Sequence, residues 1–253
     1  MSSAETPTQV EFSKSGHTAT LTLTSPTGVN ILASPVLGTL GSFVQRLAED
    51  AEVRFVVIRG AGKTFAAGAD IAQMSRYNEE DGKAYSKSGH HVFDAIASLP
   101  QVTFAVLNGH ALGGGCELAM ACDFRIATAG TKLGQPESRL GLVPGWGGTS
   151  RLRCLVGLAA ARRLMFTGES IAADEAMRIG LVDEVVPGVE ELDAAIARWC
   201  DRVKAGSPAA IRRIKHALMH GDETSQFAFC FSCSDAREGM SAFLEKRPAA
   251  WTK

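Results

Sequence analysis

No apolar run in this 253-residue chain approaches the ~20 residues needed to span a bilayer. There is also no excess of either charge: 26 lysines and arginines face 27 aspartates and glutamates, for a net charge of −1. Composition therefore gives no reason to expect nucleic acid or an anionic membrane as a partner. The first residues, MSSAETPTQVEF, lack the basic and then apolar regions of a signal peptide. We expect a soluble cytoplasmic protein.

Signatures of three common enzyme classes are missing as well. There is no GxSxG, which argues against a serine hydrolase of the α/β type, and no GxGxxG after a strand, which argues against dinucleotide binding. The segment GAGKT, Gly60–Thr64, resembles the end of a phosphate-binding loop. The complete pattern needs a glycine where this chain has Val57, so we reject a nucleoside triphosphate site.

Cysteine and histidine patterns give no metal site. Cys230 and Cys233 form a single CxxC inside a predicted helix, without a second CxxC or a histidine pair at ligand spacing. His90 and His91 lack a third ligand nearby and are interpreted as a solvated helix face. The other cysteines lie in apolar surroundings, where a free thiol behaves as a small hydrophobe: Cys116, Cys122, Cys154 and Cys200.

Strands alternate with helices as far as about Pro187, which predicts an α/β core over residues 1–188. A hairpin and three short buried strands are expected at Val10–Phe12 with Thr18–Thr24, Arg54–Arg59, Val102–Leu107 and Phe124–Thr128. Helices are expected from Ser34-Pro35, near Tyr85–Leu99, over Gly115–Cys122 and from Trp146. Residues 189–253 read as helices alone: Glu190–Ala205, Pro208–His220 and Glu223–Arg247.

Two loops of small residues follow the predicted buried strands. FAAGAD, Phe65–Asp70, comes after the first, and ALGGGCE, Ala111–Glu117, after the second. With few side chains in the way, one backbone N–H from each loop could converge on a single ligand oxygen. That is the construction of an oxyanion hole, which stabilises a developing negative charge.

Two carboxylates stand beside these loops. Glu117 lies in an otherwise apolar segment, and Glu137 lies in the turn-rich GQPESRLGLVPGWGGT, Gly134–Thr149. Read singly, Glu117 could be a paired glutamate of a buried helix and Glu137 a surface residue that caps a turn. Two carboxylates next to an oxyanion hole instead indicate acid–base chemistry on an activated carbonyl compound. Their environments should separate the two pKa values, in an order that the sequence does not fix.

Five segments together resemble the enoyl-CoA hydratase (crotonase) family from about Val10 to Arg247. They are FAAGADI, NGHALGGGCELAMACD, GQPESRLGLVPGWGGTSRL, FTGESIAADEAMRIGLVDEVVP and REGMSAFLEKR. The resemblance implies a spiral of ββα units carrying the CoA site and the glutamates, followed by a helical region that forms trimers or dimers of trimers. It implies an acyl-CoA thioester as substrate, and no metal or redox cofactor.

The resemblance also implies roles for individual residues. The N–H groups of Ala69 and Gly114 would hold the thioester oxygen, Glu117 would act as base on the attacking water, and Glu137 would deliver a proton to C2. The remaining positions that match contacts with CoA or border the acyl pocket are Ala67, Gly68, Asp70, Ile71, Met74, Trp146, Phe243 and Lys246.

The chain departs from the family pattern in three places. SPTGVNIL, Ser25–Leu32, lacks the basic residue that often precedes the Asn-Ala-Leu motif and has Ile31 in place of alanine. Trp146 replaces a small residue, and we expect it to narrow or reshape the acyl pocket. The interval from Phe65 to Glu117 is two residues longer than is typical.

Retention of both glutamates favours hydration of a 2-enoyl-CoA. The alternatives are a double-bond isomerase, which needs only a proton shuttle, and a non-catalytic acyl-CoA-binding or RNA-associated member of the fold.

Overall fold

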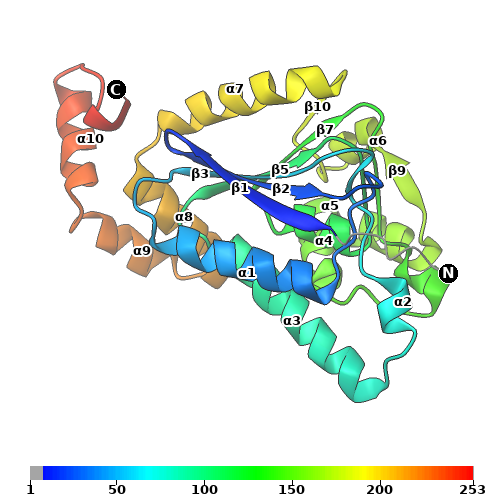
Figure 1. Cartoon of the computed structure of the whole chain (residues 1–253). Helices are drawn as coiled ribbons and strands as arrows, with labels where there is room; N and C mark the ends of the chain where they lie inside the picture. The colour runs from blue at the N-terminus through cyan, green and yellow to red at the C-terminus, as the bar shows by residue number, and fades with distance from the viewer. Residues whose placement is uncertain (1–7, 253) are drawn as a thin grey trace. The chain divides into compact units, whose positions relative to one another are not determined.

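The computed structural model describes residues 8–252 (Figure 1). The chain divides into two compact units, one ending at Asp193 and the other beginning at Ala194. The assignment of catalysis to residues 1–188 and of assembly to residues 189–253 stays a prediction.

Two sheets form the first unit. The larger has the strand order β1-β2-β3-β5-β7-β10, in which β1 and β2 are antiparallel and every later pair is parallel. Its strands are β1 Gln9–Ser15, β2 Thr18–Thr24, β3 Phe55–Gly60, β5 Val102–Leu107, β7 Phe124–Thr128 and β10 Glu184–Val186. The smaller has the order β4-β6-β8-β9, with β4 Thr64–Ala66, β6 His110–Leu112, β8 Lys132–Gly134 and β9 Ser170–Ala172.

Three consecutive repeats connect these sheets. In each repeat a strand of the large sheet is followed within a few residues by a strand of the small sheet, and then by helix: β3-β4, β5-β6 and β7-β8. The predicted hairpin and buried strands are confirmed, with the strand expected at Arg54–Arg59 displaced by one residue. Every residue of β5 is buried, which explains its continuous apolar sequence, VTFAVL.

Helices cover the repeats. They are α1 Ser34–Glu49, α2 Ile71–Met74, α3 Glu79–Ala97, α4 Gly114–Met120, α5 Gly148–Thr167 and α6 Ala173–Arg178. α1 and α3 pack side by side (Figure 1). α3 begins earlier than the expected Tyr85, because Asn78 and Asp81 form a capping box that satisfies the first N–H groups of the helix.

The second unit is helical, as predicted, with α7 (Leu192–Lys204, whose first residues belong to the first unit), α8 Pro208–His220, α9 Glu223–Cys230 and α10 Ser234–Leu244. The single helix expected over Glu223–Arg247 is wrong. Asp235 accepts hydrogen bonds from the Ser207 hydroxyl (2.6 Å) and the Ala209 N–H (3.3 Å), which tie the start of α10 to the start of α8. The chain must turn to reach them, and it does so between α9 and α10.

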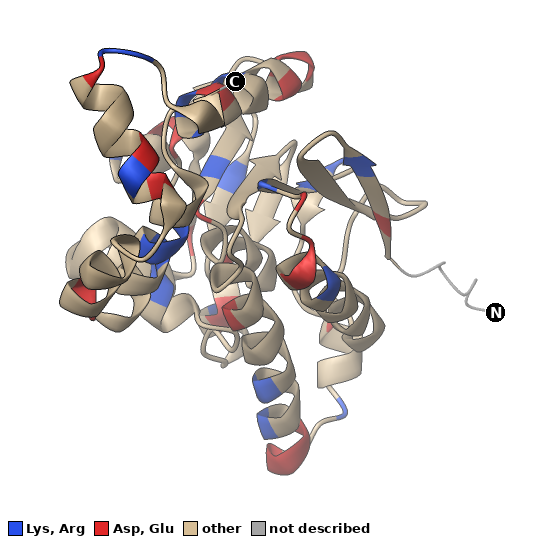
Figure 2. Cartoon of the chain, turned by 90° about the vertical axis from the view of Figure 1, so that its left-hand side faces the viewer, with Lys and Arg blue, Asp and Glu red and all other residues tan. Residues whose placement is uncertain are grey.

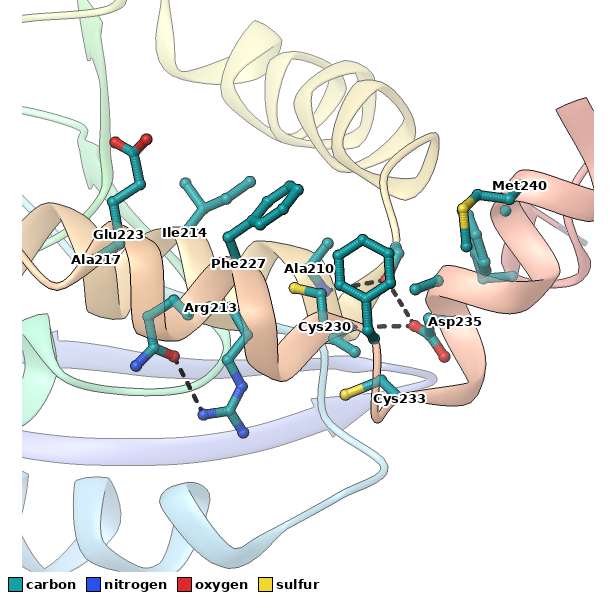
Figure 3. A pocket seen from close by; sticks show the side chains of 17 residues that line it. Ala210, Arg213, Ile214, Ala217, Glu223, Phe227, Cys230, Cys233, Asp235 and Met240 are labelled. Carbon is teal, nitrogen blue, oxygen red and sulfur yellow. Dashed lines mark hydrogen bonds between the residues drawn. The ribbon is translucent and has the colours of Figure 1, made fainter.

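An apolar pocket of about 500 Å³ lies within this second unit (Figure 3). Ile214 of α8, Phe227 of α9 and Met240 of α10 line it together with Cys230 and Cys233. The CxxC therefore spans the break between two helices, rather than lying inside one helix.

The remaining surface features are ordinary. Both signs of charge are dispersed over the elements (Figure 2). None of the helices among residues 8–252 combines the length and apolar character of a membrane span. Cys116, Cys122 and Cys200 are buried as expected, but Cys154 is exposed, because its position on α5 faces away from the core.

Candidate active site

The two loops of small residues leave the same edge of the small sheet. β4 and β6 are parallel neighbours, with Ala66 opposite Ala111, so the segments that follow them start side by side. Gly68 has a φ of +110°, and a methyl group there would lie 3.0 Å from the Leu112 carbonyl and 3.6 Å from the Gly114 nitrogen. Only glycine allows this close approach of the two backbones.

The N–H groups of Ala69 and Gly114 face no acceptor among the described residues, whereas their neighbours are engaged. The Ala67 N–H donates to the Asn30 carbonyl (2.7 Å), and the Gly68 carbonyl accepts from the Leu32 N–H (2.8 Å). The loop is thus fixed by two hydrogen bonds directly before the unused N–H of Ala69. This arrangement agrees with the oxyanion-hole roles predicted for Ala69 and Gly114, which stay predictions.

Asn30 is a functional candidate that the sequence did not single out. Its side chain is fully buried, and its amide nitrogen donates to the carbonyls of Ala61, Thr64 and Phe65 at 3.2, 2.9 and 3.2 Å. It therefore holds the segment that leads into the Ala69 loop. Two signals were available: an asparagine between apolar residues in VNIL, and its match to the asparagine of the Asn-Ala-Leu motif.

Glu117 lies on α4, where it is 2 % exposed. One carboxylate oxygen, Oε1, accepts the N–H groups of Trp146 and Gly148, each at 2.7 Å. A methyl group on Gly148 would lie 2.9 Å from that oxygen, so glycine is needed for this approach. Burial raises the pKa of Glu117, and the two N–H donors oppose the rise.

Glu137 lies in the short 3-10 helix Pro136–Leu140, on the other side of the glycine turn. Gly113 has a φ of +53°, and a methyl group on it would lie 3.0 Å from Glu137 Oε1. Burial, and then the negative charge of Glu117, raise the pKa of Glu137 to about 7. Burial thus raises the pKa of both carboxyl groups, and the two short N–H donors to Glu117 favour its ionised form. The predicted separation of the two pKa values stays a prediction.

Gln135 is the second candidate that the sequence missed. It is 1 % exposed, and with its amide nitrogen turned toward Glu137 it donates to both carboxylate oxygens, at 3.1 and 3.0 Å. It also contacts the Cys116 thiol, whose pKa is raised to about 12 by burial. Cys116 therefore stays protonated and is no nucleophile.

Trp146 is buried, with 3 % of the residue exposed. Its ring makes edge contacts with Tyr85 and Phe93, with centroids 5.2 and 5.5 Å apart. Its backbone N–H donates to Glu117, so Trp146 contacts the site through its backbone as well as through its side chain. The expected narrowing of an acyl pocket by Trp146 stays a prediction.

The residues predicted to contact CoA differ in their burial and in their structural roles. Asp70 caps α2 by accepting the Gln73 N–H (2.9 Å), and Ile71 on that helix is exposed. Met74 packs against the core, and Phe243 is exposed on α10 in the second unit. Lys246 was expected in the last helix, but α10 ends at Leu244 and Lys246 has a φ of +54°.

Replacement of Gly113 by alanine is expected to lower the free energy of unfolding by about 1–3 kcal/mol, the cost of a non-glycine residue in this conformation. The added methyl would also press on Glu137, so kcat should fall. Denaturant unfolding and turnover measure the two effects. Gly38→Ala is the control, because Gly38 has ordinary helical φ and nothing lies within 4 Å of its added methyl. Equal free energies of unfolding for Gly113→Ala and Gly38→Ala would contradict the need for glycine at position 113.

Across residues 8–252 no group of three His, Cys, Asp or Glu side chains is placed to hold a metal ion, and His90 instead bonds to the Ser86 carbonyl (3.1 Å).

The sequence of the whole chain is similar to those of known proteins. The family model of enoyl-CoA hydratase/isomerase matches residues 13–253. The chain is 40% identical over 249 residues to a short-chain-enoyl-CoA hydratase of Clostridium acetobutylicum, covering 94% of this chain and 95% of the relative. It is 41% identical over 242 residues to a crotonyl-CoA hydratase of Syntrophomonas wolfei, covering 91% and 93%.

Solved structures of the same family have the same fold. An enoyl-CoA hydratase from Bacillus anthracis superposes with a TM-score of 0.88 at 34% identity, covering 98% of this chain and 99% of that one. The crotonase-like α/β fold predicted from the sequence is thereby confirmed. By sequence and by fold, the chain belongs to the enoyl-CoA hydratase/isomerase family.

Proposed function

We propose that this protein is an enoyl-CoA hydratase, a lyase that adds water syn across the C2=C3 bond of a 2-trans-enoyl-CoA to give a 3-hydroxyacyl-CoA. The observation that carries the proposal is the placement around one glycine turn of two carboxyl groups whose pKa values are both raised by burial. Glu117 accepts two N–H groups, and Glu137 lies against Gly113 with a pKa of about 7. The names of the two relatives above support the same reaction.

In the proposed mechanism, ionised Glu117 removes a proton from water as the water oxygen bonds to C3. The electron pair of the C2=C3 bond moves toward the thioester oxygen, where the N–H groups of Ala69 and Gly114 receive the developing charge. Protonated Glu137 then delivers its proton to C2. One such N–H donor contributes about 2.7–4 kcal/mol to transition-state stabilisation.

The proposal is tested with crotonyl-CoA, by loss of the conjugated enoyl-thioester absorbance. Hydration by the wild-type protein supports it. The isomerase alternative predicts the opposite optical change, because a 3-enoyl-CoA would gain absorbance as its double bond moves into conjugation. Binding of acyl-CoA esters without turnover of either substrate would favour the non-catalytic alternative.

The second unit supports a further part of the proposal, assembly into a homotrimer or a dimer of trimers. Large apolar side chains stay exposed on its helices, among them Leu218, Phe227, Phe231, Phe243 and Leu244. Exposed apolar patches of this kind mark interaction surfaces. We expect the mass in solution to be three or six times that of the 26.7 kDa chain, as measured by light scattering coupled to gel filtration. A monomer at micromolar concentration would contradict this expectation.

A further inference from the structure

The ring of Trp146 lies between two glycines that belong to different helices. Gly89 is on α3, and Gly114 is the first residue of α4. A methyl group added to Gly89 would overlap Cγ, Cδ1 and Nε1 of the indole. One added to Gly114 would overlap the opposite end of the same ring, at 2.6 Å from Cε3. The indole thus fills the whole space between the α3 backbone and the residue that carries a predicted oxyanion donor.

The ring is also held from several directions, so that it has little freedom to move. Its Nε1 donates to the Tyr85 carbonyl (3.3 Å), and the rings of Tyr85 and Phe93 make T-shaped contacts with it. The backbone of Trp146 is held as well, because the Arg151 guanidinium donates to its carbonyl (2.8 Å) and pairs with Asp94 of α3.

The backbone beside the ring is fixed to the same helix. The Ser86 hydroxyl of α3 donates to the Gly145 carbonyl (2.6 Å). Trp146 itself donates its N–H to Glu117 (2.7 Å). A single residue therefore contacts the predicted base through its backbone and the predicted oxyanion donor through its ring.

From these contacts we propose that Trp146 is a positioning residue. Its indole, seated in the notch at Gly89, sets the place of the Gly114 N–H relative to the Glu117 carboxylate. This inference rests on the proposed function, since it concerns the thioester oxygen that Gly114 would hold. A shift of about 1 Å in a group that must meet the reacting atoms can cost about 10²-fold in rate.

The test perturbs the two ends of the ring separately. Gly89→Ala pushes on the end at α3, while Trp146→Phe removes the distal ring that reaches Gly114. Gly82→Ala on the same helix is the matched control, because an added methyl there meets nothing within 4 Å. We expect Gly89→Ala to lower kcat for crotonyl-CoA about 10- to 100-fold with little change in KM. Gly82→Ala should leave both unchanged.

The two changes should not be additive. In the Trp146→Phe background the ring no longer reaches Gly114, so Gly89→Ala should cost little further kcat. A side chain that only stabilises the core predicts equal losses in both backgrounds, and that result would overturn the proposal. So would a folded Gly89→Ala protein with wild-type kcat. If Gly89→Ala does not fold, Trp146→Phe alone decides: undiminished kcat overturns the inference.

A second readout separates this inference from the proposed function. The C=O stretch of bound butyryl-CoA, which cannot be hydrated, reports hydrogen bonding at the thioester oxygen. We expect it to move back toward the free-ligand frequency in Gly89→Ala and in Trp146→Phe, but not in Gly82→Ala. A wild-type protein that fails to hydrate crotonyl-CoA would contradict the proposed function, and the stretch would still decide the role of Trp146. An unchanged stretch in both variants would exclude that role.

Discussion

Glu117→Gln is expected to lower kcat for the hydration of crotonyl-CoA about 10³- to 10⁴-fold, the upper part of the range for loss of a general base. The glutamine retains a carbonyl oxygen that can accept the Trp146 and Gly148 N–H groups, which donate to Oε1 at 2.7 Å in the native protein. The surrounding loop should therefore stay in place, and KM should change little. Loss of the enoyl-thioester absorbance measures the effect.

A matched control is Glu11→Gln, which removes one exposed carboxylate from β1. Its kcat should equal that of the wild type, so that any loss in Glu117→Gln is assigned to the site rather than to net charge. Activity of Glu117→Gln within tenfold of the wild type would exclude Glu117 as the base.

Glu137→Gln is expected to lower kcat about 10²- to 10⁴-fold, because an amide cannot deliver the proton to C2. The pH profile gives a sharper test. In the proposed mechanism, activity requires protonated Glu137, whose pKa is about 7, so kcat/KM should fall about tenfold per pH unit above that value. Activity that instead rises through pH 8 would show that Glu137 acts in its ionised form.

Glu137→Gln should also change the free energy of unfolding, by an amount that depends on pH. The pKa of Glu137 rises from 4.5 to about 7 on folding, so the unfolded chain releases this proton at lower pH than the native protein. Native stability from this group is present below pH 4.5 and is lost as the pH rises to about 7. Relative to the wild type, Glu137→Gln should gain about 1–3 kcal/mol in unfolding free energy between pH 4.5 and pH 8. Urea unfolding at the two pH values measures the difference.

Much of the architecture was accessible from the sequence because its signals are local. A short apolar run rich in β-branched and aromatic residues, such as VTFAVL, favours a strand buried on both faces, and β5 is that strand. Glu117 was visible because a charge inside an apolar segment beside three glycines breaks two local rules together. The structure gives the reason for both: the carboxylate is paired with N–H groups, and Gly113 needs its positive φ.

The features that sequence reasoning missed depend on distant partners. Asn30 donates hydrogen bonds to carbonyls that lie 31 to 35 residues further along the chain. The residues next to it in the sequence therefore do not show which groups it binds. Gln135 matters because of what it faces, Glu137 and Cys116, rather than because of its neighbours in sequence. The helix expected over Glu223–Arg247 is wrong for the same reason, since Asp235 accepts a hydrogen bond from Ser207, the N-cap of α8.

The parallel pairing of β4 with β6 has a consequence for how the chain tolerates changes in length. The segment between them, from Ala67 through α2 and α3 to β5, leaves the small sheet and returns to the large one. The register of Ala66 against Ala111, not the number of residues in that excursion, sets the distance between the two glycine-rich loops. We therefore expect the interval from Phe65 to Glu117, two residues longer than is typical, to leave both predicted donors in place. Insertions at the exposed turn between α2 and α3 should vary the surface of the protein while the predicted oxyanion donors keep their spacing.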